Sequence, residues 1–370
     1  MKKILMLIPA LNAGGAERVM VTLANEWSKT NDVTIAIFHT SGSFYDLNES
    51  VHLIEMGLSL PAGGVKRKLS IPLVEFKRYR FIVKLVKNGG FDFVLSFTNI
   101  TNLFTCLMAR RLKNEFFVIS ERADPKDYSK YMKLAMDKLY RKCDLVVCQN
   151  KVVKAFFEGR GFTNRLEILP NPVCFRDIPS QMPQKREHII STVGRLTRQK
   201  NHKLLINAFR EVHALHPEYK LRIYGIGPLE NELRAQIEDL SLSDCVELMG
   251  TKKKVMYDIN HTEIFVLCSD YEGFLNVLIE AMAAQMPVIS SNFATGVAKE
   301  LISDGENGYL FEVGNQEQLV SCLNQAIARS SEFESIGRKN RILALEYRDE
   351  TVAERWLETI LRAREEKQAN

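Results

Sequence analysis

The feature that most constrains the fold is an alternation of short apolar runs with helix-forming stretches, which occurs twice. The first series begins with an apolar run at residues 4–9, a glycine turn and a helical stretch over 16–29. A second series begins at residue 188. Strands that alternate with helices are typical of βαβ units around a parallel sheet. The sequence therefore predicts two doubly wound α/β domains, with ligands bound in a cleft between them.

The chain length also favours two domains, because 370 residues exceed what one hydrophobic core usually supports. We expect an N-terminal domain over residues 1–172 and a C-terminal domain over 188–349. The polar stretch 173–187, with Pro179 and Pro183, is predicted to link them.

The N-terminus superficially resembles a signal peptide, because an apolar run follows Lys2-Lys3. The run is short and lacks a clear cleavage site, so we predict a buried first strand instead. No apolar run approaches the roughly 20 residues that span a bilayer. Seven cysteines without metal-ligand spacing favour reduced core residues in a cytosolic protein.

The net charge of +5 is unevenly distributed, since basic residues predominate up to residue 175 and acidic residues beyond it. This asymmetry indicates an anionic partner for the N-terminal half. Residues 41–70 are loop-rich but include Lys66-Arg67-Lys68, and a helix predicted over 71–88 carries five further basic residues. These residues could meet an anionic membrane surface or form a solvated basic face. No aromatic-basic module supports nucleic-acid binding, so we expect none.

Residues 269–283 carry two glutamates, Glu272 and Glu280, between two apolar strand-like runs. Eight positions along a helix cover roughly 12 Å and do not return to the same face, so the pair cannot stack as a catalytic dyad. We predict Glu272 in a turn and Glu280 inside a helix. They would contact different parts of one extended ligand, and a nucleotide diphosphate sugar has a suitable order of groups.

Arg195 and Lys200 follow the strand predicted over 188–193. An arginine fork and a lysine point charge can together bind a diphosphate. No acidic pair such as Asp-x-Asp stands out, so we expect no metal and no cofactor. The alternative is that both are ordinary surface charges.

Two further turns are candidate sites in the N-terminal half. Gly14-Gly15 precedes a helix but lacks the dinucleotide fingerprint, so it is either an anion site or a plain tight turn. Glu121-Arg122 follows a strand predicted over 116–120 and is either a site on the acceptor side or a solvated loop.

Several of these segments resemble glycosyltransferase family 4. The resemblance rests on the following segments: Gly194-Arg195-Leu196, Lys200-Asn201, Gly225-x-Gly227-Pro228, Glu272-Gly273-Phe274, Glu280-Ala281-Met282, Pro287-Val288-Ile289, Asn307-Gly308-Tyr309-Leu310 and Gly14-Gly15-Ala16-Glu17-Arg18. It covers nearly the whole chain and implies a GT-B fold and a retaining, metal-independent transferase.

The resemblance also implies roles for individual residues. Arg195 and Lys200 would hold the donor diphosphate, Glu280 the ribose, and Glu272 would lie near the reacting sugar. Arg195, Lys200 and Glu272 are the predicted catalytic residues. Gly15 would approach the phosphate from the N-terminal domain. The donor site would also include Gly273, Phe274 and Asn276, and a helix over about 350–370, around Trp356, would pack back on the first domain.

The chain departs from the family pattern at a few positions. Many members carry a histidine where this chain has Glu121 or Arg122. Paired glycines are usual at Ala294–Val297, a glycine at Gln285, and an acidic residue at Ile226. These departures affect details of sugar and phosphate contact.

We therefore expect transfer of a hexose from a UDP-sugar to a hydroxyl of a glycan acceptor linked to a polyprenyl diphosphate, in bacterial surface polysaccharide synthesis. Galactose, N-acetylgalactosamine and N-acetylglucosamine remain open as the sugar. The expected location is cytoplasmic or peripheral on the inner face of the plasma membrane. The alternatives are a nucleotide-sugar epimerase or hydrolase on the same fold, and a non-catalytic sugar-nucleotide-binding assembly protein.

Overall fold

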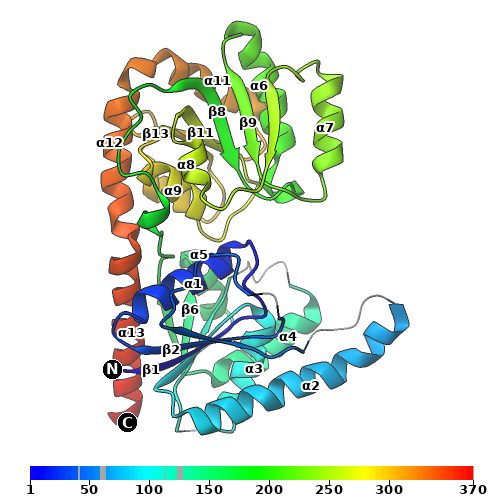
Figure 1. The fold of residues 1–370 in the computed structure, drawn as a ribbon, viewed down its shortest axis with the longest axis vertical. Helices are drawn as coiled ribbons and strands as arrows, with labels where there is room; N and C mark the ends of the chain where they lie inside the picture. The colour runs from blue at the N-terminus through cyan, green and yellow to red at the C-terminus, as the bar shows by residue number, and fades with distance from the viewer. Residues whose placement is uncertain (41, 59–63, 113, 123–127, 370) are drawn as a thin grey trace. The chain divides into compact units, whose positions relative to one another are not determined.

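A computed structural model describes residues 1–370 except 41, 59–63, 113, 123–127 and 370, and also leaves out the side chains of 64–69. The chain divides into two compact units (Figure 1). The first comprises Met1–Pro172 together with Asp349–Asn370, and the second comprises Val173–Arg348.

The first unit is built on a seven-stranded sheet in which every paired strand is parallel, in the order β3-β2-β1-β4-β5-β6-β7. The strands are β1 (Lys3–Leu7), β2 (Asp32–Ile37), β3 (Val51–Glu55), β4 (Phe93–Phe97), β5 (Phe117–Ser120), β6 (Leu145–Cys148) and β7 (Arg165–Ile168). The direction of chain progression reverses between β1 and β4, which is the topological switch point where doubly wound sheets bind ligands.

Helices cover both faces of this sheet, and each face has its own buried apolar cluster. The helices are α1 (Gly15–Trp27), α2 (Gly64–Gly89), α3 (Asn99–Ala109), α4 (Lys130–Leu139), α5 (Lys151–Glu158) and α13 (Asp349–Ala369). Strand β3 and the start of α2 fall within the stretch that we expected to be loop. Strand β3 lies at the sheet edge, where only Val51 is buried, so its apolar pattern is weak.

The second unit has a six-stranded sheet with the same kind of order, β10-β9-β8-β11-β12-β13, and its strand pairs are also parallel. The strands are β8 (Glu187–Val193), β9 (Lys220–Tyr224), β10 (Val246–Gly250), β11 (Thr262–Leu267), β12 (Val288–Ser291) and β13 (Gly308–Phe311). Its switch point lies between β8 and β11, which are distant in sequence but paired in the sheet.

The helices of the second unit again enclose the sheet from both faces, over two apolar clusters. They are α6 (His202–Leu215), α7 (Glu230–Asp239), α8 (Val255–Ile259), α9 (Asn276–Ala283), α10 (Val297–Leu301), α11 (Gln316–Ala328) and α12 (Phe333–Ala344). The stretch that we expected to be a linker contributes Val173, Phe175 and Ile178 to one of these clusters.

Helix α13 packs against α1 within the first unit, although the whole second unit lies between them in sequence. Trp356 is fully buried, and its Nε1 donates a hydrogen bond to Pro170 O at 2.8 Å. A second bond runs from α1 to α13, in which Trp27 Nε1 donates to Ala353 O at 2.8 Å. This helix therefore completes the core of the first unit.

Within the described residues, no helix is both long and apolar enough to cross a membrane. All seven cysteine side chains are free, and six of them are buried.

Candidate functional site

The turn after β8 places the two predicted cations at the switch point of the second unit. A short 3-10 helix, Arg198–Lys200, leads to Asn201, which adopts the left-handed conformation at φ 46°. The Asn201 side chain accepts a hydrogen bond from Leu204 N and so caps α6. The backbone thereby reverses within a few residues, between the strand and the helix.

Glycines allow a second loop to lie directly against this turn. Gly225 has a φ of +147°, and a Cβ there would overlap Gly194 O. A Cβ at Gly227 would likewise crowd the backbone of Leu196. Hydrogen bonds from Gly194 N to Tyr224 O (2.9 Å) and from Leu196 N to Ile226 O (3.0 Å) join the loops. The Gly225-x-Gly227 spacing therefore reflects close backbone packing.

Lys200 and Glu272 form an ion pair between the turns that follow β8 and β11. Both side chains are largely buried, at 15% and 10% exposure. Ser269, which is fully buried, donates its Oγ–H to Glu272 Oε1 at 2.6 Å. The carboxylate is thus held by a cation and a hydroxyl at once.

Further hydrogen bonds join the turn after β8 to the turn after β11. Asp270 N donates to Gln199 O at 2.8 Å, and Asn201 Nδ2 donates to Asp270 Oδ1 at 2.8 Å. Gln199 Nε2 donates to Tyr271 O at 2.9 Å. We call this set of contacts the 199–271 strap. It fixes the segment that carries Lys200 against the segment that carries Glu272.

The other predicted donor residues lie on or near α9. Glu272 lies in the turn and Glu280 inside α9, where it is only 3% exposed. Gly273, Phe274 and Asn276 are half-buried around the start of α9. Leu275, the N-cap residue of α9, makes no side-chain cap hydrogen bond, and helix N-termini favour anions. Arg195 is exposed and makes no ion pair with any described residue.

In the first unit, Gly15 is exposed and begins α1, directly after β1 and a short turn. Gly14 is the N-cap residue, and the Glu17 carboxylate lies where a Cβ on Gly14 would be. A side chain at position 14 would therefore displace the Glu17 carboxylate from the helix start. Gly15 belongs to the first unit, whereas the other predicted donor residues belong to the second. The predicted donor site therefore draws on residues of both units.

Glu121 and Arg122, the predicted acceptor-side residues, have different environments. Glu121 is fully buried and accepts hydrogen bonds from Tyr128 Oη (2.7 Å), Tyr140 Oη (3.1 Å) and Arg122 N (2.9 Å). Burial, with the Glu121 charge as the next cause, raises the pKa of Tyr140 well above its usual value. Glu121 therefore anchors the segment that follows β5.

The Arg122 guanidinium lies 3.9 Å from the centre of the Phe97 ring and 5.6 Å from that of Trp356. Its Nη1 donates to Asn171 Oδ1. Burial lowers the pKa of Arg122 to about 9, and Glu121 partly offsets this effect, so the group remains a cation at neutral pH. Its Nε and Nη2 are buried without a hydrogen-bond partner among the described residues.

Sequence reasoning did not assign roles to Ser269, Asp270 or Asn171. The Ser269-x-x-Glu272 spacing could have indicated the role of Ser269, because side chains three residues apart often meet in a turn. The other two have no comparable local signal. Among the residues that the structure describes, no group of three or more His, Cys, Asp or Glu side chains could hold a metal ion.

Comparison with known proteins agrees with this architecture. Residues 13–175 match the family model described as "Glycosyltransferase Family 4", and residues 176–342 match "Glycosyl transferases group 1". Sucrose-phosphate synthase from Thermosynechococcus elongatus has the same fold, with a TM-score of 0.83, 15% identity, and coverage of 98% of this chain and 99% of that one. TarM superposes with a TM-score of 0.80 at 16% identity, covering 97% of this chain and 99% of that one.

Two sheets of this order with these neighbours define the GT-B class of glycosyltransferases, as the sequence predicted. A Campylobacter jejuni protein is 32% identical over 340 residues, covering 87% of this chain and 89% of its own length. It is named "N-acetylgalactosamine-N,N'-diacetylbacillosaminyl-diphospho-undecaprenol 4-alpha-N-acetylgalactosaminyltransferase". The chain belongs to glycosyltransferase family 4.

A second Campylobacter jejuni relative is 28% identical over 367 residues, which is 97% of this chain and 98% of the relative. Its name is "GalNAc-alpha-(1->4)-GalNAc-alpha-(1->3)-diNAcBac-PP-undecaprenol alpha-1,4-N-acetyl-D-galactosaminyltransferase".

Proposed function

We propose that this glycosyltransferase moves a hexose, with retention at the anomeric carbon, from a UDP-sugar to a hydroxyl of a glycan linked to a polyprenyl diphosphate. Galactose, N-acetylgalactosamine and N-acetylglucosamine are the candidate sugars, and the product would serve bacterial surface polysaccharide synthesis. The names of the two Campylobacter jejuni relatives support the acceptor and favour N-acetylgalactosamine. A structural neighbour bound to UDP and glucose supports the donor class.

The observation that carries the proposal is the buried Lys200–Glu272 ion pair at the switch point, with Ser269 on the same carboxylate. A lysine ammonium has three N–H donors. One is directed to Glu272, so the others can contact an oxygen of the donor diphosphate. Glu272 would then accept a hydrogen bond from a hydroxyl of the donor sugar.

In this mechanism, Arg195 provides the second cation. The bond between the sugar and the diphosphate breaks, and negative charge grows on the departing phosphate oxygens. The acceptor oxygen bonds the anomeric carbon on the same face, its proton passes to a departing phosphate oxygen, and UDP leaves. Arg195, Lys200 and the start of α9 stabilise that charge. Removing one such group typically costs on the order of 10²–10³ in rate. Two fixed cations would replace a metal ion, so excess EDTA is expected to leave the rate unchanged.

We place Arg122, rather than the enclosed Glu121, on the acceptor side. The guanidinium has two buried nitrogens, Nε and Nη2, without a described partner, which suits an anionic or hydroxylated acceptor group. Gly15 at the start of α1 would contribute its backbone to the donor phosphate.

The test is donor turnover by Arg195→Ala and Glu280→Ala, with Arg210→Ala as the matched control. Arg210 is an exposed arginine on α6. We expect the first two variants to lose at least a hundredfold in rate, and the control to retain the parent rate. Activity of both site variants within a few-fold of the parent would refute the assignment.

Two alternative functions can be separated with the same protein. An epimerase or hydrolase would convert the UDP-sugar without an acceptor, whereas a transferase would not. A non-catalytic sugar-nucleotide-binding assembly protein would bind the donor tightly but release no UDP with any acceptor.

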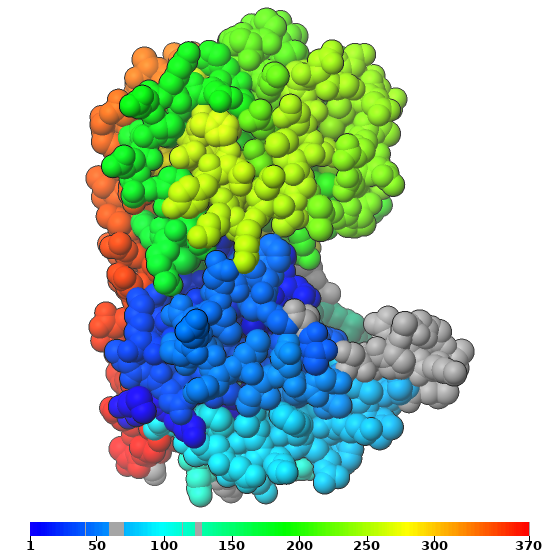
Figure 2. All heavy atoms as spheres, in the orientation of Figure 1, coloured from blue at the N-terminus to red at the C-terminus, as the bar shows by residue number. Residues whose placement is uncertain are grey.

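We further propose that the first unit meets an anionic membrane at the inner face of the plasma membrane through α2. One stripe of this helix is exposed and lacks acidic residues. The described part of α2 is drawn in light blue in the surface view (Figure 2). Its apolar members Leu73, Phe76 and Phe81 are 57%, 55% and 39% exposed. The basic members of the stripe are Lys77, Arg80, Lys84 and Lys87.

The opposite face of α2 packs on the unit. Ile82 and Val86 are buried there, and so is Arg78, which hydrogen-bonds Leu58 O and pairs with Glu75. Arg78 is therefore not part of the exposed basic surface. Lys66-Arg67-Lys68, the basic cluster noted in the sequence, lies outside the described side chains.

Basic groups near an anionic surface contribute about 1 kcal/mol each. Changing Lys77, Arg80 and Lys84 to alanine should therefore weaken binding to phosphatidylglycerol vesicles by roughly 100-fold. An equal change at Lys185, Lys220 and Lys339, which are exposed on the second unit, is the control. Equal losses in both triple variants, or no salt-sensitive binding by the parent, would refute this surface.

A further inference from the structure

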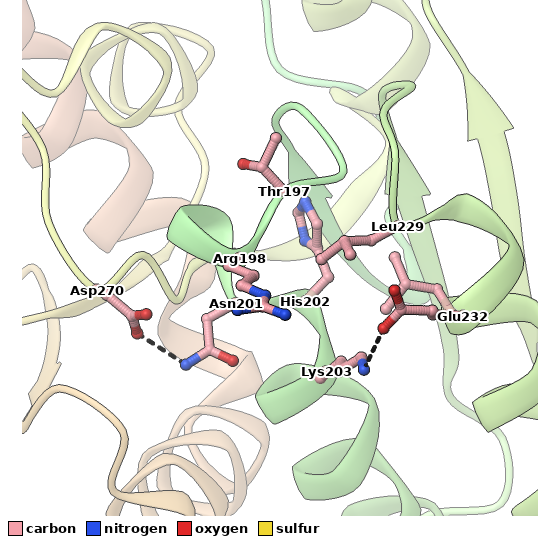
Figure 3. Close-up of a pocket in the computed structure, with 9 residues that line it drawn as sticks. Thr197, Arg198, Asn201, His202, Lys203, Leu229, Glu232 and Asp270 are labelled. Carbon is pink, nitrogen blue, oxygen red and sulfur yellow. Dashed lines mark hydrogen bonds and ion pairs between the residues drawn. The ribbon is translucent and has the colours of Figure 1, made fainter.

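A cavity of about 370 Å³ lies beside the 199–271 strap, entirely within the second unit. Three elements form it: residues 197–203, the start of α7, and Asp270 (Figure 3). The volume is within the range of small-molecule sites. Neither Arg195 nor Glu272 nor Glu280 lines the cavity, so it is separate from the proposed donor site.

The inner part of the cavity is polar and lacks internal partners. His202 is only 3% exposed, and the backbone of Gly194 and Arg195 approaches its ring, but neither ring nitrogen makes a well-formed hydrogen bond to a described residue. Thr197 Oγ1 is buried in the same way. Figure 3 shows the imidazole between Thr197 and Leu229. Buried polar groups normally have partners, so this pair indicates that a ligand group completes the site.

The protonation state of His202 limits the chemistry of that group. Burial lowers the pKa of His202 to about 4, with the Lys200 charge as the next cause, and the backbone of Gly194 and Arg195 offsets part of this lowering. The imidazole is therefore neutral at pH 7, with one donor and one acceptor nitrogen. A hydroxyl group, which both donates and accepts, matches such a ring and the Thr197 hydroxyl.

The rim carries charge. Arg198 is exposed and has no ion pair with a described residue, whereas Lys203 pairs with Glu232 at 2.7 Å. The 14-residue helix α6 also begins here, at His202. An arginine and a helix N-terminus favour an anion. Glu232 and Asp270 are available as acceptors for further hydroxyl groups.

We propose that this cavity binds a sugar phosphate of monosaccharide size and acts as an effector site. The phosphate lies at Arg198 and the start of α6, and the sugar hydroxyls face His202 and Thr197. The ligand contacts Asn201 and Asp270, whose side chains are hydrogen-bonded across the strap. Binding therefore stabilises the arrangement of Lys200 and Glu272. This coupling rests on the proposed donor site, whereas the binding itself does not.

The probe is glucose 6-phosphate, and the readout is the unfolding temperature with saturating UDP present. We expect a rise of about 2 °C at ten times the dissociation constant. Inorganic phosphate and glucose should each give a smaller rise. Arg198→Gln and Thr197→Val should abolish the effect, whereas Arg210→Gln should retain it.

No rise with glucose 6-phosphate, or an equal rise in all variants, overturns the site. Loss of the effect when UDP is added would mean that the phosphate enters the donor site, which also overturns the proposal. If UDP itself does not shift the unfolding temperature, the proposal of a UDP-sugar donor is refuted. The effect of glucose 6-phosphate on the variants is then compared without UDP. The coupling predicts that glucose 6-phosphate tightens UDP binding at least fivefold, because linkage between sites is reciprocal. An unchanged UDP affinity refutes the coupling alone.

Discussion

Substitution of Ser269 by alanine tests whether the hold on Glu272 matters for chemistry. The Ser269 hydroxyl is fully buried and donates to Glu272 Oε1 at 2.6 Å. A hydrogen bond to a charged group contributes about 1.5–3 kcal/mol. Ser269→Ala keeps the ion pair between Lys200 and Glu272 but removes the hydrogen bond from Ser269 to the Glu272 carboxylate. If that contact orients Glu272 in the transition state, kcat should fall about 10- to 100-fold.

The assay is UDP release with a saturating acceptor, together with UDP affinity by calorimetry. A positioning role predicts a loss in kcat with an almost unchanged affinity for UDP. Ser290→Ala is the matched control, because Ser290 is equally buried but its Oγ donates only to a backbone carbonyl, Ser291 O at 3.1 Å. A kcat for Ser269→Ala within twofold of the parent, or an equal loss in both variants, would refute the reasoning.

Three further predictions concern stability and use urea unfolding. Gly225→Ala should destabilise the chain by more than about 2 kcal/mol, since the new Cβ would overlap Gly194 O and strain a positive φ. Trp356→Phe leaves Pro170 O without its donor and should cost about 1–3 kcal/mol. The pKa of His202 is lowered to about 4, so the unfolded chain binds a proton first as pH falls below about 6.5. Acidification from pH 7 to 4 should therefore remove up to about 3 kcal/mol through this residue, and His202→Asn should lose that part of the pH dependence.

Controls distinguish these mechanisms from general damage. Gly90→Ala introduces a residue at a φ of +61° with open space around it, so it should cost only the backbone strain. An effect as large as that of Gly225→Ala would contradict the packing argument. An unchanged acid sensitivity in His202→Asn would contradict the assignment of that sensitivity to a buried neutral imidazole.

The fold could be predicted because strands buried on both faces are continuous apolar runs. Residues 4–7 of β1 and the whole of β11 are buried, and both were evident from sequence. Strand β3 was missed because an edge strand needs no such run, and only Val51 among its residues is buried. The start of α2 was missed because proline and glycine precede it in the sequence.

The candidate site was predictable only where local geometry determines it. The positions of Glu272 and Glu280 follow from helix periodicity. The Lys200–Glu272 pair and the Asn201–Asp270 bond join residues about 70 positions apart. They meet because β8 and β11 are neighbours in the sheet, and this pairing depends on the crossover topology. Likewise, no local pattern distinguishes the enclosed Glu121 from the adjacent Arg122.

The packing of α13 on α1 has a consequence for the order of folding during synthesis. The second unit is one continuous segment, but the first unit needs residues from Asp349 onward. Domains usually fold as they leave the ribosome, the N-terminal one first. Here the nascent first unit must wait, with the α1 surface that later contacts α13 uncovered, while the second unit can already fold. A nascent chain stalled before Asp349 should therefore bind chaperones through α1, and release should follow synthesis of the last helix.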